Sequence, residues 1–336
     1  MARRAVIFGC DGPRLTPEEA AFFRTADPWG FILFARNVET PEQVRRLTGE
    51  LRAAVGWEAP VLIDQEGGRV QRMRAPHWRE WLPPLDQCTL AGRSAARSMY
   101  LRYRIMADEL SAAGIDVNCA PCGDLAGEAT HPFLRNRCYG SEPGRVAGIA
   151  RAVATGLMAG GVLPVMKHMP GHGRATVDSH EGLPRTDASP EELGLTDFEV
   201  FRALSDLPLG MTAHVVFEAF DDRPATLSPR MVRLIREEIG FDGLLMTDDI
   251  GMGALGGAVA ARGAAAIAAG CDVVLHCNAT LPEREAMAAA VGRMSEAARL
   301  RGDRALRARR NPQPIDIPAA EAELAALLDG QADERP

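Results

Sequence analysis

The chain has 336 residues, of which 46% are hydrophobic and 25% are charged, and its formal net charge is -7. This composition is typical of a globular protein, and the negative charge argues against nonspecific binding of nucleic acid. The apolar runs are shorter than the roughly 18 residues of a membrane-spanning helix, and the apolar run of the basic N-terminus is too short for a signal peptide, so we expect a cytoplasmic protein without a membrane partner.

Eight short apolar runs alternate with helix-like stretches along the chain. The runs, each typical of a buried strand, are residues 5–9, 30–34, 60–63, 115–119, 162–166, 207–211, 243–246 and 271–275. The helical stretches are residues 17–25, 41–55, 91–113, 145–160, 190–204, 228–239, 259–269 and 282–294. Thr16, Thr40 and Ser189 each precede a first-turn proline and are good N-caps. Eight strand–helix repeats predict a single (β/α)8 TIM-type barrel over residues 1–298.

The pattern changes after the last predicted helix. Six arginines crowd this segment, namely Arg299, Arg301, Arg304, Arg307, Arg309 and Arg310. We interpret them as a solvated helix face that pairs with acidic surface groups, not as a nucleic-acid patch. Residues 315–328 follow as a small helix that packs back on the barrel. Residues 299–336 are therefore predicted to form a short, Arg-rich helical extension and tail.

Polar residues follow nearly every predicted strand. They are Asp11, Arg36, Asn37, Asp64, Asn118, Lys167, His168, His214, Asp248, Asp249, His276 and Asn278. The carboxyl ends of barrel strands share one face, which carries the active sites of such enzymes. Polar groups at these positions are costly unless they line a wet pocket. The sequence therefore predicts a polar, catalytic cavity at this face.

The densest group of titratable residues lies between positions 163 and 185. We expect the strand to end at Met166 and to release into a loop that carries Lys167, His168, Asp178 and His180. A carboxylate two residues before a histidine can orient its imidazole and make it a general acid/base. The alternative is a surface loop that is merely rich in histidine. A serine nucleophile between the two is disfavoured, because the chain has no G-x-S-x-G motif.

Asp248 ends the strand across the predicted barrel. A carboxylate at such a position can be a nucleophile, a metal ligand or a stabilising charge. The histidines of the site could complete a metal site with it, namely His168, His172, His180 and His214. Lys167 next to His168, however, places a fixed cation where a divalent ion would sit. We therefore expect neither a catalytic metal nor a cofactor.

The chain has seven cysteines, which we interpret as reduced thiols because no export signal is visible. Cys119 and Cys122 have the spacing of a redox motif, but they follow an apolar run and do not open a helix. Two buried small side chains are the better interpretation than a catalytic dithiol.

Five segments resemble the signatures of glycoside hydrolase family 3, and they occur along the chain in the order in which the family has them. Within this family, they are most similar to those of the single-domain bacterial β-N-acetylhexosaminidases of peptidoglycan recycling. The segments are Lys167–Gly173 (KHMPGHG) with the following Asp178-Ser179-His180, residues 62–70 (LIDQEGGRV), residues 136–140 (NRCYG), residues 211–216 (MTAHVV), and residues 240–243 (GFDG) leading to Thr247-Asp248-Asp249. The departures are modest: Met169 replaces the usual Phe, Cys138-Tyr139 replaces Ser-Phe, and Thr247 and Ile250-Gly251 replace Ser and Leu-Ser. The Arg-rich tail lies outside the resemblance.

The resemblance implies a role for each matching residue. Asp248 would be the nucleophile that forms a covalent glycosyl-enzyme, and His180, oriented by Asp178, would be the acid/base. The residues that would bind the N-acetylglucosamine (GlcNAc) hydroxyls and neighbouring groups are Asp64, Arg72, Arg137, Lys167 and His168.

The function implied is that of a cofactor-free, retaining exo-β-N-acetylglucosaminidase. Its expected substrate is GlcNAc-1,6-anhydro-MurNAc, with or without a peptide, and we expect a monomer that binds only this small sugar or muropeptide. A β-glucosidase or a phosphorolytic relative remains open, because a histidine acid/base does not repel phosphate as a carboxylate would. A sugar-binding protein on an inert barrel is a further alternative, against which the joint presence of Asp178, His180 and Asp248 argues.

Overall fold

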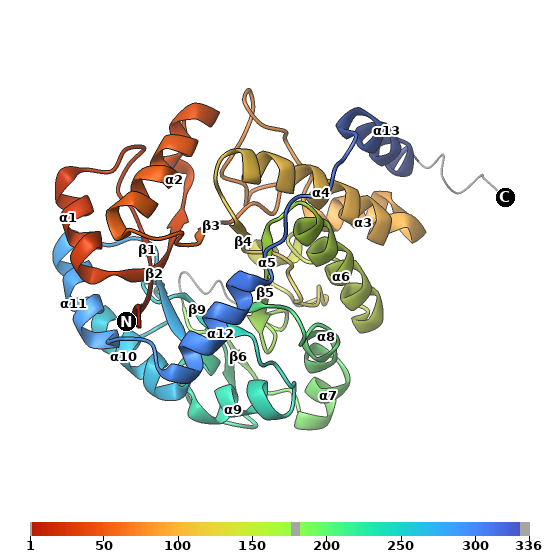
Figure 1. The fold of residues 1–336 in the computed structure, drawn as a ribbon. Coiled ribbons are helices and arrows are strands. Elements are labelled where there is room, and N and C mark those ends of the chain that lie inside the picture. Colours follow the sequence, from red (N-terminus) through yellow and green to blue (C-terminus); the bar gives the residue numbers. More distant parts are fainter. Residues whose placement is uncertain (1, 176–181, 330–336) are drawn as a thin grey trace.

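The computed structural model describes residues 2–175 and 182–329. Eight parallel strands close into a barrel in the order β1-β10-β9-β7-β5-β4-β3-β2, and Figure 1 shows the helices arranged around it. The barrel strands are β1 (Arg4–Gly9), β2 (Pro28–Leu33), β3 (Val61–Ile63), β4 (Val117–Asn118), β5 (Leu163–Met169), β7 (Leu209–Thr212), β9 (Leu244–Asp249) and β10 (Val273–His276). The predicted (β/α)8 barrel is thereby confirmed, because each of the eight predicted runs contains one of these strands or overlaps it.

The helices follow the strands as the capping pattern predicts. They are α1 (Pro17–Ala26), α2 (Pro41–Val55), α3 (Pro84–Leu90), α4 (Ala95–Ala112), α5 (Pro132–Arg135), α6 (Pro143–Ala159), α7 (Pro190–Leu195), α8 (Asp197–Ala203), α9 (Pro229–Glu237), α10 (Val259–Ala269), α11 (Leu281–Val291), α12 (Glu296–Arg307) and α13 (Ile317–Leu328). The side chains of Thr16, Thr40 and Ser189 accept backbone N–H groups at their helix N-termini. Short 3-10 turns occupy Ala35–Asn37, Gly92–Ser94 and Ala225–Leu227, and β6 (Arg185–Thr186) pairs with β8 (Val216–Phe217) outside the barrel.

Two of the predicted helices differ from those observed. The stretch predicted as one helix over 190–204 is divided into α7 and α8 at Thr196, whose backbone (φ -124°, ψ -91°) leaves the helical region. The helix predicted from residue 91 begins only at Ala95, and a separate helix, α3, precedes it within the long insertion after β3. Helix α3 was not predicted from the sequence, although Pro84 stands in its first turn, a position at which proline is common in helices.

The end of β5 also differs from the prediction, and the difference bears on the site. The strand continues beyond Met166 to Met169, so Lys167 and His168 lie in the barrel wall and not in a loop. The backbone N–H of Lys167 donates to Pro121 O at 3.0 Å, and Met169 O accepts from Ala213 N at 2.7 Å. The two polar residues are therefore held by strand pairing on both sides.

The C-terminal helices pack on the barrel at two places. A Cβ at Gly302 of α12 would lie 2.9 Å from Trp29 Nε1 and 3.3 Å from Leu244 Cδ1, so α12 covers the end of the barrel at which β2 and β9 begin. Leu324 and Leu327 of α13 are buried in a cluster with residues of α4, and Figure 1 shows α13 at the periphery. The predicted boundary at residue 298 falls within α12, and the division into barrel and extension stays a prediction.

Arg299, Arg301, Arg304 and Arg309 of the C-terminal segment contact acidic groups, as predicted, although Asp272 and Asp116 among these partners are largely buried and not part of a solvated face. Arg301 contacts Asp242 and Asp272, and Arg309 contacts Asp116. Within residues 2–175 and 182–329, the structure has no helix that combines the length and the apolar character needed to traverse a lipid bilayer.

Candidate active site

A polar pocket of about 340 Å³ opens at the face where the barrel strands end. Of the predicted site residues, those that line it are Asp64, Arg72, Arg137, Lys167, His168 and Asp248. Phe34, Phe133, Met252 and Leu275 supply apolar walls. A larger cavity of about 760 Å³, bounded by Arg174, Arg185 and neighbouring residues, contains none of these six. Polar residues at the ends of β3, β5, β9 and β10 thus line one cavity, which is part of the convergence that the distribution of polar residues predicted.

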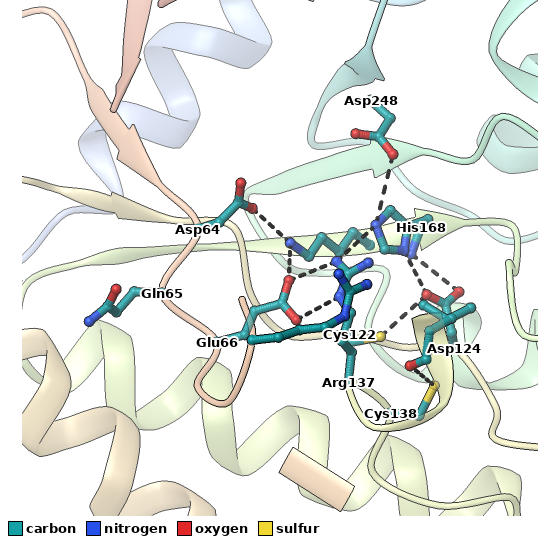
Figure 2. A network of polar contacts seen from close by, with 12 residues as sticks. Asp64, Gln65, Glu66, Cys122, Asp124, Arg137, Cys138, His168 and Asp248 are labelled. Atoms are coloured by element: carbon teal, nitrogen blue, oxygen red, sulfur yellow. Dashed lines mark hydrogen bonds and ion pairs between the residues drawn. The ribbon is translucent and has the colours of Figure 1, made fainter. Parts of the chain in front are cut away.

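One wall of this pocket is a row of alternating charges (Figure 2). Arg72 Nη2 lies 3.2 Å from Asp64 Oδ2, and Lys167 Nζ lies 3.0 Å from Asp64 Oδ1. Lys167 also contacts Glu66 Oε1 at 2.5 Å, and Glu66 accepts two hydrogen bonds from Arg137 at 2.8 and 2.9 Å. The side chains of Glu66 and Lys167 are each only 2% exposed. Two buried cations are therefore balanced by two carboxylates.

The charges of this row determine one another's protonation. Burial would raise the pKa of Glu66, but the Arg137 and Lys167 charges outweigh it and lower the pKa from 4.5 to about 2. Burial would also raise the pKa of Asp64. The charges of Lys167 and Arg72 outweigh this effect and hold the pKa well below its ordinary value. Burial would lower the pKa of Lys167, yet Asp64 and Glu66 raise it. The row is therefore fully charged at neutral pH and presents fixed donors and acceptors.

Behind His168, a buried carboxylate fixes the imidazole. His168 Nδ1 lies 2.6 Å from Asp124 Oδ2, and Asp124 Oδ1 accepts the backbone N–H of His172 at 2.7 Å. Burial would raise the pKa of Asp124, but its contacts with His168 and His172 outweigh burial and keep it below the ordinary value. An ionised carboxylate can only accept, so Nδ1 carries a proton and Nε2 faces the pocket. There Nε2 lies 3.5 Å from Arg137 Nη2 and 3.9 Å from Asp248 Oδ2.

Asp248 stands opposite this wall, at the end of β9, with its side chain 20% exposed. Its Oδ1 accepts the N–H of Asp249 at 2.8 Å. Burial would raise the pKa of Asp248, but the nearby imidazoles of His168 and His214, the backbone N–H of Asp249 and the Lys167 charge together lower it below the ordinary value. His214 Nε2 donates to Asp249 O at 3.0 Å while Nδ1 accepts from Thr226 Oγ1 at 2.8 Å. An ionised carboxylate on a strand end anchored in this way can act as a nucleophile or as a stabilising charge.

Two further strand-end residues, Asp249 and Asn278, also line the pocket. The other polar residues predicted at the strand ends are not among its lining residues. Asp11 pairs with Arg284, whereas Asn37 and Asn118 are buried and hydrogen-bond to backbone groups. The predicted acid/base pair, Asp178 and His180, lies outside the described residues.

Two carboxylates that support the site were not assigned a role from the sequence. Glu66 and Asp124 are fully buried, which is rare for acids unless they are paired. Glu66 lies two positions beyond Asp64, and Asp124 follows Gly123 shortly after β4. In both cases the position of a carboxylate shortly after a barrel strand could have indicated a residue of the site.

Comparison with known proteins places this geometry in a family. Residues 17–307 match the sequence model of the family described as "Glycosyl hydrolase family 3 N terminal domain". The chain is 36% identical over 282 residues to a protein of Alkalilimnicola ehrlichii named Beta-hexosaminidase, covering 81% of this chain and 80% of that protein.

Solved structures agree with this match. The crystal structure of NagZ from Neisseria gonorrhoeae in complex with N-trifluoroacetyl-D-glucosamine has a TM-score of 0.86 and 31% identity, covering 98% of this chain and 99% of that one. A glycoside hydrolase family 3 β-N-acetylglucosaminidase from Paenibacillus sp. str. FPU-7 has a TM-score of 0.84 and 28% identity, and the match spans 97% of this chain but 66% of that one. From the matched sequence, the closed barrel and the charged pocket together, we conclude that this chain is a glycoside hydrolase of family 3.

Proposed function

We propose that this enzyme is a retaining exo-β-N-acetylglucosaminidase. The observation that carries the proposal is the pocket itself, which has a volume of about 340 Å³. In it the ionised Asp248 lies opposite the row formed by Asp64, Lys167 and Arg137. Such a volume is near the lower end of ligand pockets, which suits one terminal sugar better than an internal stretch of polymer. Fixed carboxylates and arginines are suited to a polyhydroxylated ring. The names of the Alkalilimnicola ehrlichii and Paenibacillus relatives support the same substrate class.

In the proposed mechanism, Asp248 attacks the anomeric carbon and forms a covalent glycosyl-enzyme. Asp64, Arg72, Arg137, Lys167 and His168 hold the hydroxyl and neighbouring groups of the sugar. The anchoring of Asp248 through the backbone of Asp249 supports this role, because a nucleophile must keep its position as charge leaves it.

The acid/base role rests on the sequence resemblance. His180, oriented by Asp178, protonates the leaving oxygen in the first step and removes a proton from water in the second. Water then releases the sugar with its original anomeric configuration, because two inversions at one carbon restore it.

The proposed natural substrate is GlcNAc-1,6-anhydro-MurNAc, with or without its peptide, and the proposed setting is peptidoglycan recycling in the cytoplasm. The seven free, buried cysteines suit a reducing compartment. We propose that the enzyme acts as a monomer.

The test is to compare turnover of nitrophenyl-GlcNAc with nitrophenyl-glucoside, each with and without phosphate. The proposal expects fast release from the GlcNAc substrate, slow release from the glucoside, and no acceleration by phosphate. Preference for the glucoside would identify a β-glucosidase, and acceleration with formation of a sugar phosphate would identify a phosphorylase. Binding of GlcNAc without turnover of either substrate would identify an inert sugar-binding barrel.

A further inference from the structure

The last helix, α13, packs on the insertion that carries part of the sugar pocket. The helix lies beyond residues 17–307, so the sequence match with the family does not extend to it. Figure 1 shows it at the periphery, next to α4. The insertion comprises residues 64–83, all of which the structure describes, and these residues form no helix or strand of their own. Such a segment is kept in place by side-chain contacts, and several contacts of this one lead to α13.

Arg79 joins the insertion to both α13 and α4. Its Nε donates to Glu321 Oε1 of α13, and its Nη1 donates to Glu109 Oε1 of α4 at 2.7 Å. The backbone N–H of Arg79 donates to the same oxygen of Glu109 at 3.3 Å. One arginine thus connects three segments that lie far apart in the sequence.

An apolar contact accompanies this ionic one. Leu324 and Leu327 of α13 are buried in one cluster with Leu101 of α4, and Trp81 of the insertion packs against this cluster. The carbonyl oxygen of Trp81 accepts the N–H of Gly68 at 2.8 Å. The packing of α13 therefore supports a residue that itself holds the glycine turn at the start of the insertion.

From Arg79, hydrogen bonds lead to Arg72 in the sugar pocket. The side chain of Gln71 donates to Arg79 O at 2.7 Å and to Met73 O at 2.9 Å, which ties the backbone next to Arg72 to that of Arg79. Gln65 Oε1 accepts the N–H groups of Arg72 and Met73 at 2.9 and 3.1 Å. Within residues 2–175 and 182–329, the Nε of Arg72 is buried without a hydrogen-bond partner. The guanidinium therefore depends on this backbone for its position, in addition to its ion pair on the pocket wall.

We propose that α13 is a positioning element of the sugar pocket, because it holds Arg79 and Trp81 and through them keeps Arg72 where the sugar binds. This inference rests on the proposed function, in which Arg72 is one of the residues that hold the sugar. A group that holds the substrate equally in the ground state and in the transition state affects KM and leaves kcat unchanged. Loosening of α13 should therefore raise KM for the GlcNAc substrate.

Two glutamates of α13 allow a matched comparison. Glu321 pairs with Arg79 of the insertion, whereas Glu323 pairs with Arg97 of α4, and both glutamate side chains are 44% exposed. Glu321→Arg and Glu323→Arg therefore reverse the charge in similar ion pairs of the same helix, and only the first pair lies on the path to the pocket. Leu324→Ala is the stronger variant, because it removes a buried anchor of α13.

The first experiment measures hydrogen–deuterium exchange of the full-length protein by mass spectrometry and needs no sugar. Glu321→Arg should speed exchange of the backbone amides of residues 66–82 by about 2- to 5-fold, the effect that loss of one exposed ion pair allows. Leu324→Ala should speed exchange there further, and within α13 by at least about 30-fold, the lower end for truncation of a buried leucine. Glu323→Arg should leave residues 66–82 at the rates of the parent protein. Parent rates over residues 66–82 in both Glu321→Arg and Leu324→Ala would overturn the proposal.

The second experiment measures steady-state kinetics with nitrophenyl-GlcNAc. We expect KM to rise by about 2- to 5-fold in Glu321→Arg and by more in Leu324→Ala, with kcat within about 2-fold of the parent value, whereas Glu323→Arg should match the parent in both constants. Faster exchange over residues 66–82 without a change in KM, or equal changes of KM in the two arginine variants, would overturn the positioning role. If the parent protein did not turn over the GlcNAc substrate, the proposed function would fail, while the exchange experiment would still decide whether α13 holds the insertion.

Discussion

Replacing Glu66 with glutamine tests whether the buried row of charges holds the sugar-binding cations in place. The variant keeps the shape of the side chain but removes its charge. The amide keeps one acceptor oxygen, so Arg137 loses at least one of its two hydrogen bonds, and Asp64 is the one carboxylate left to Lys167. The fall of the Glu66 pKa from 4.5 to about 2 corresponds to about 3 kcal/mol in favour of the ionised form. Removing one partner of a buried ion pair typically costs about 3–5 kcal/mol, which agrees.

We expect Glu66→Gln to lower the melting temperature by about 6–10 °C, at about 2 °C for each kcal/mol in a domain of this size. kcat/KM should fall roughly 10- to 100-fold, because small displacements of positioning groups are costly. The folded-state pKa of Glu66 is depressed, so the stabilisation is complete above pH 4.5 and is lost as the pH falls toward 2. The difference in melting temperature between parent and variant should therefore be constant from pH 5 to 8.

The assay is thermal unfolding by calorimetry together with steady-state kinetics. Glu80→Gln is the control, because Glu80 makes a comparable contact with Arg74 at 2.7 Å while its side chain is 48% exposed. An exposed pair contributes about 1 kcal/mol or less, so this variant should melt within about 2 °C of the parent. An unchanged melting temperature in Glu66→Gln would refute the stabilising role of the row. Reduced stability with unchanged kcat/KM would refute its role in positioning.

Further predictions concern the catalytic groups. Asp248→Ala should reduce kcat by roughly 10⁴- to 10⁶-fold with the fold intact. In the parent protein, a fluorinated slow substrate should label the peptide that contains Asp248, and labelling of the peptide that contains Asp64 would contradict the assignment. His180→Ala should slow single-turnover cleavage of a disaccharide by about 10²–10⁴-fold but cleavage of an activated aryl glycoside far less, since a good leaving group needs little protonation; equal losses would exclude proton transfer by His180. Asp124→Asn should reduce kcat/KM by about 10- to 100-fold, the equivalent of one hydrogen bond to a charged group, because His168 loses the carboxylate that orients it; kcat/KM equal to that of the parent would make Asp124 merely structural. Activity should survive treatment with EDTA, and restoration of a lost activity by zinc would return a metallohydrolase to consideration.

The sequence by itself determined the barrel and the main charged residues of the pocket wall. Strand–helix alternation is a local property, because apolar runs, first-turn prolines and N-caps such as Thr16 and Thr40 act within a few residues. The carboxyl ends of parallel barrel strands must share one face, so the convergence of Asp64, Lys167 and Asp248 followed from the topology. The family followed from the order of the motifs.

Only the tertiary structure decided how the charges are paired and where the polar strand ends. Lys167 and His168 lie inside β5 because Glu66 and Asp124, which come from other strands' loops, neutralise or hydrogen-bond their buried polar atoms. The pairing of Glu66 with Arg137, 71 positions apart, and of Asp124 with His168, 44 positions apart, depends on barrel closure. No periodicity or local propensity records such contacts, since the energy of a buried charge depends on partners that only the closed fold brings within a few ångströms.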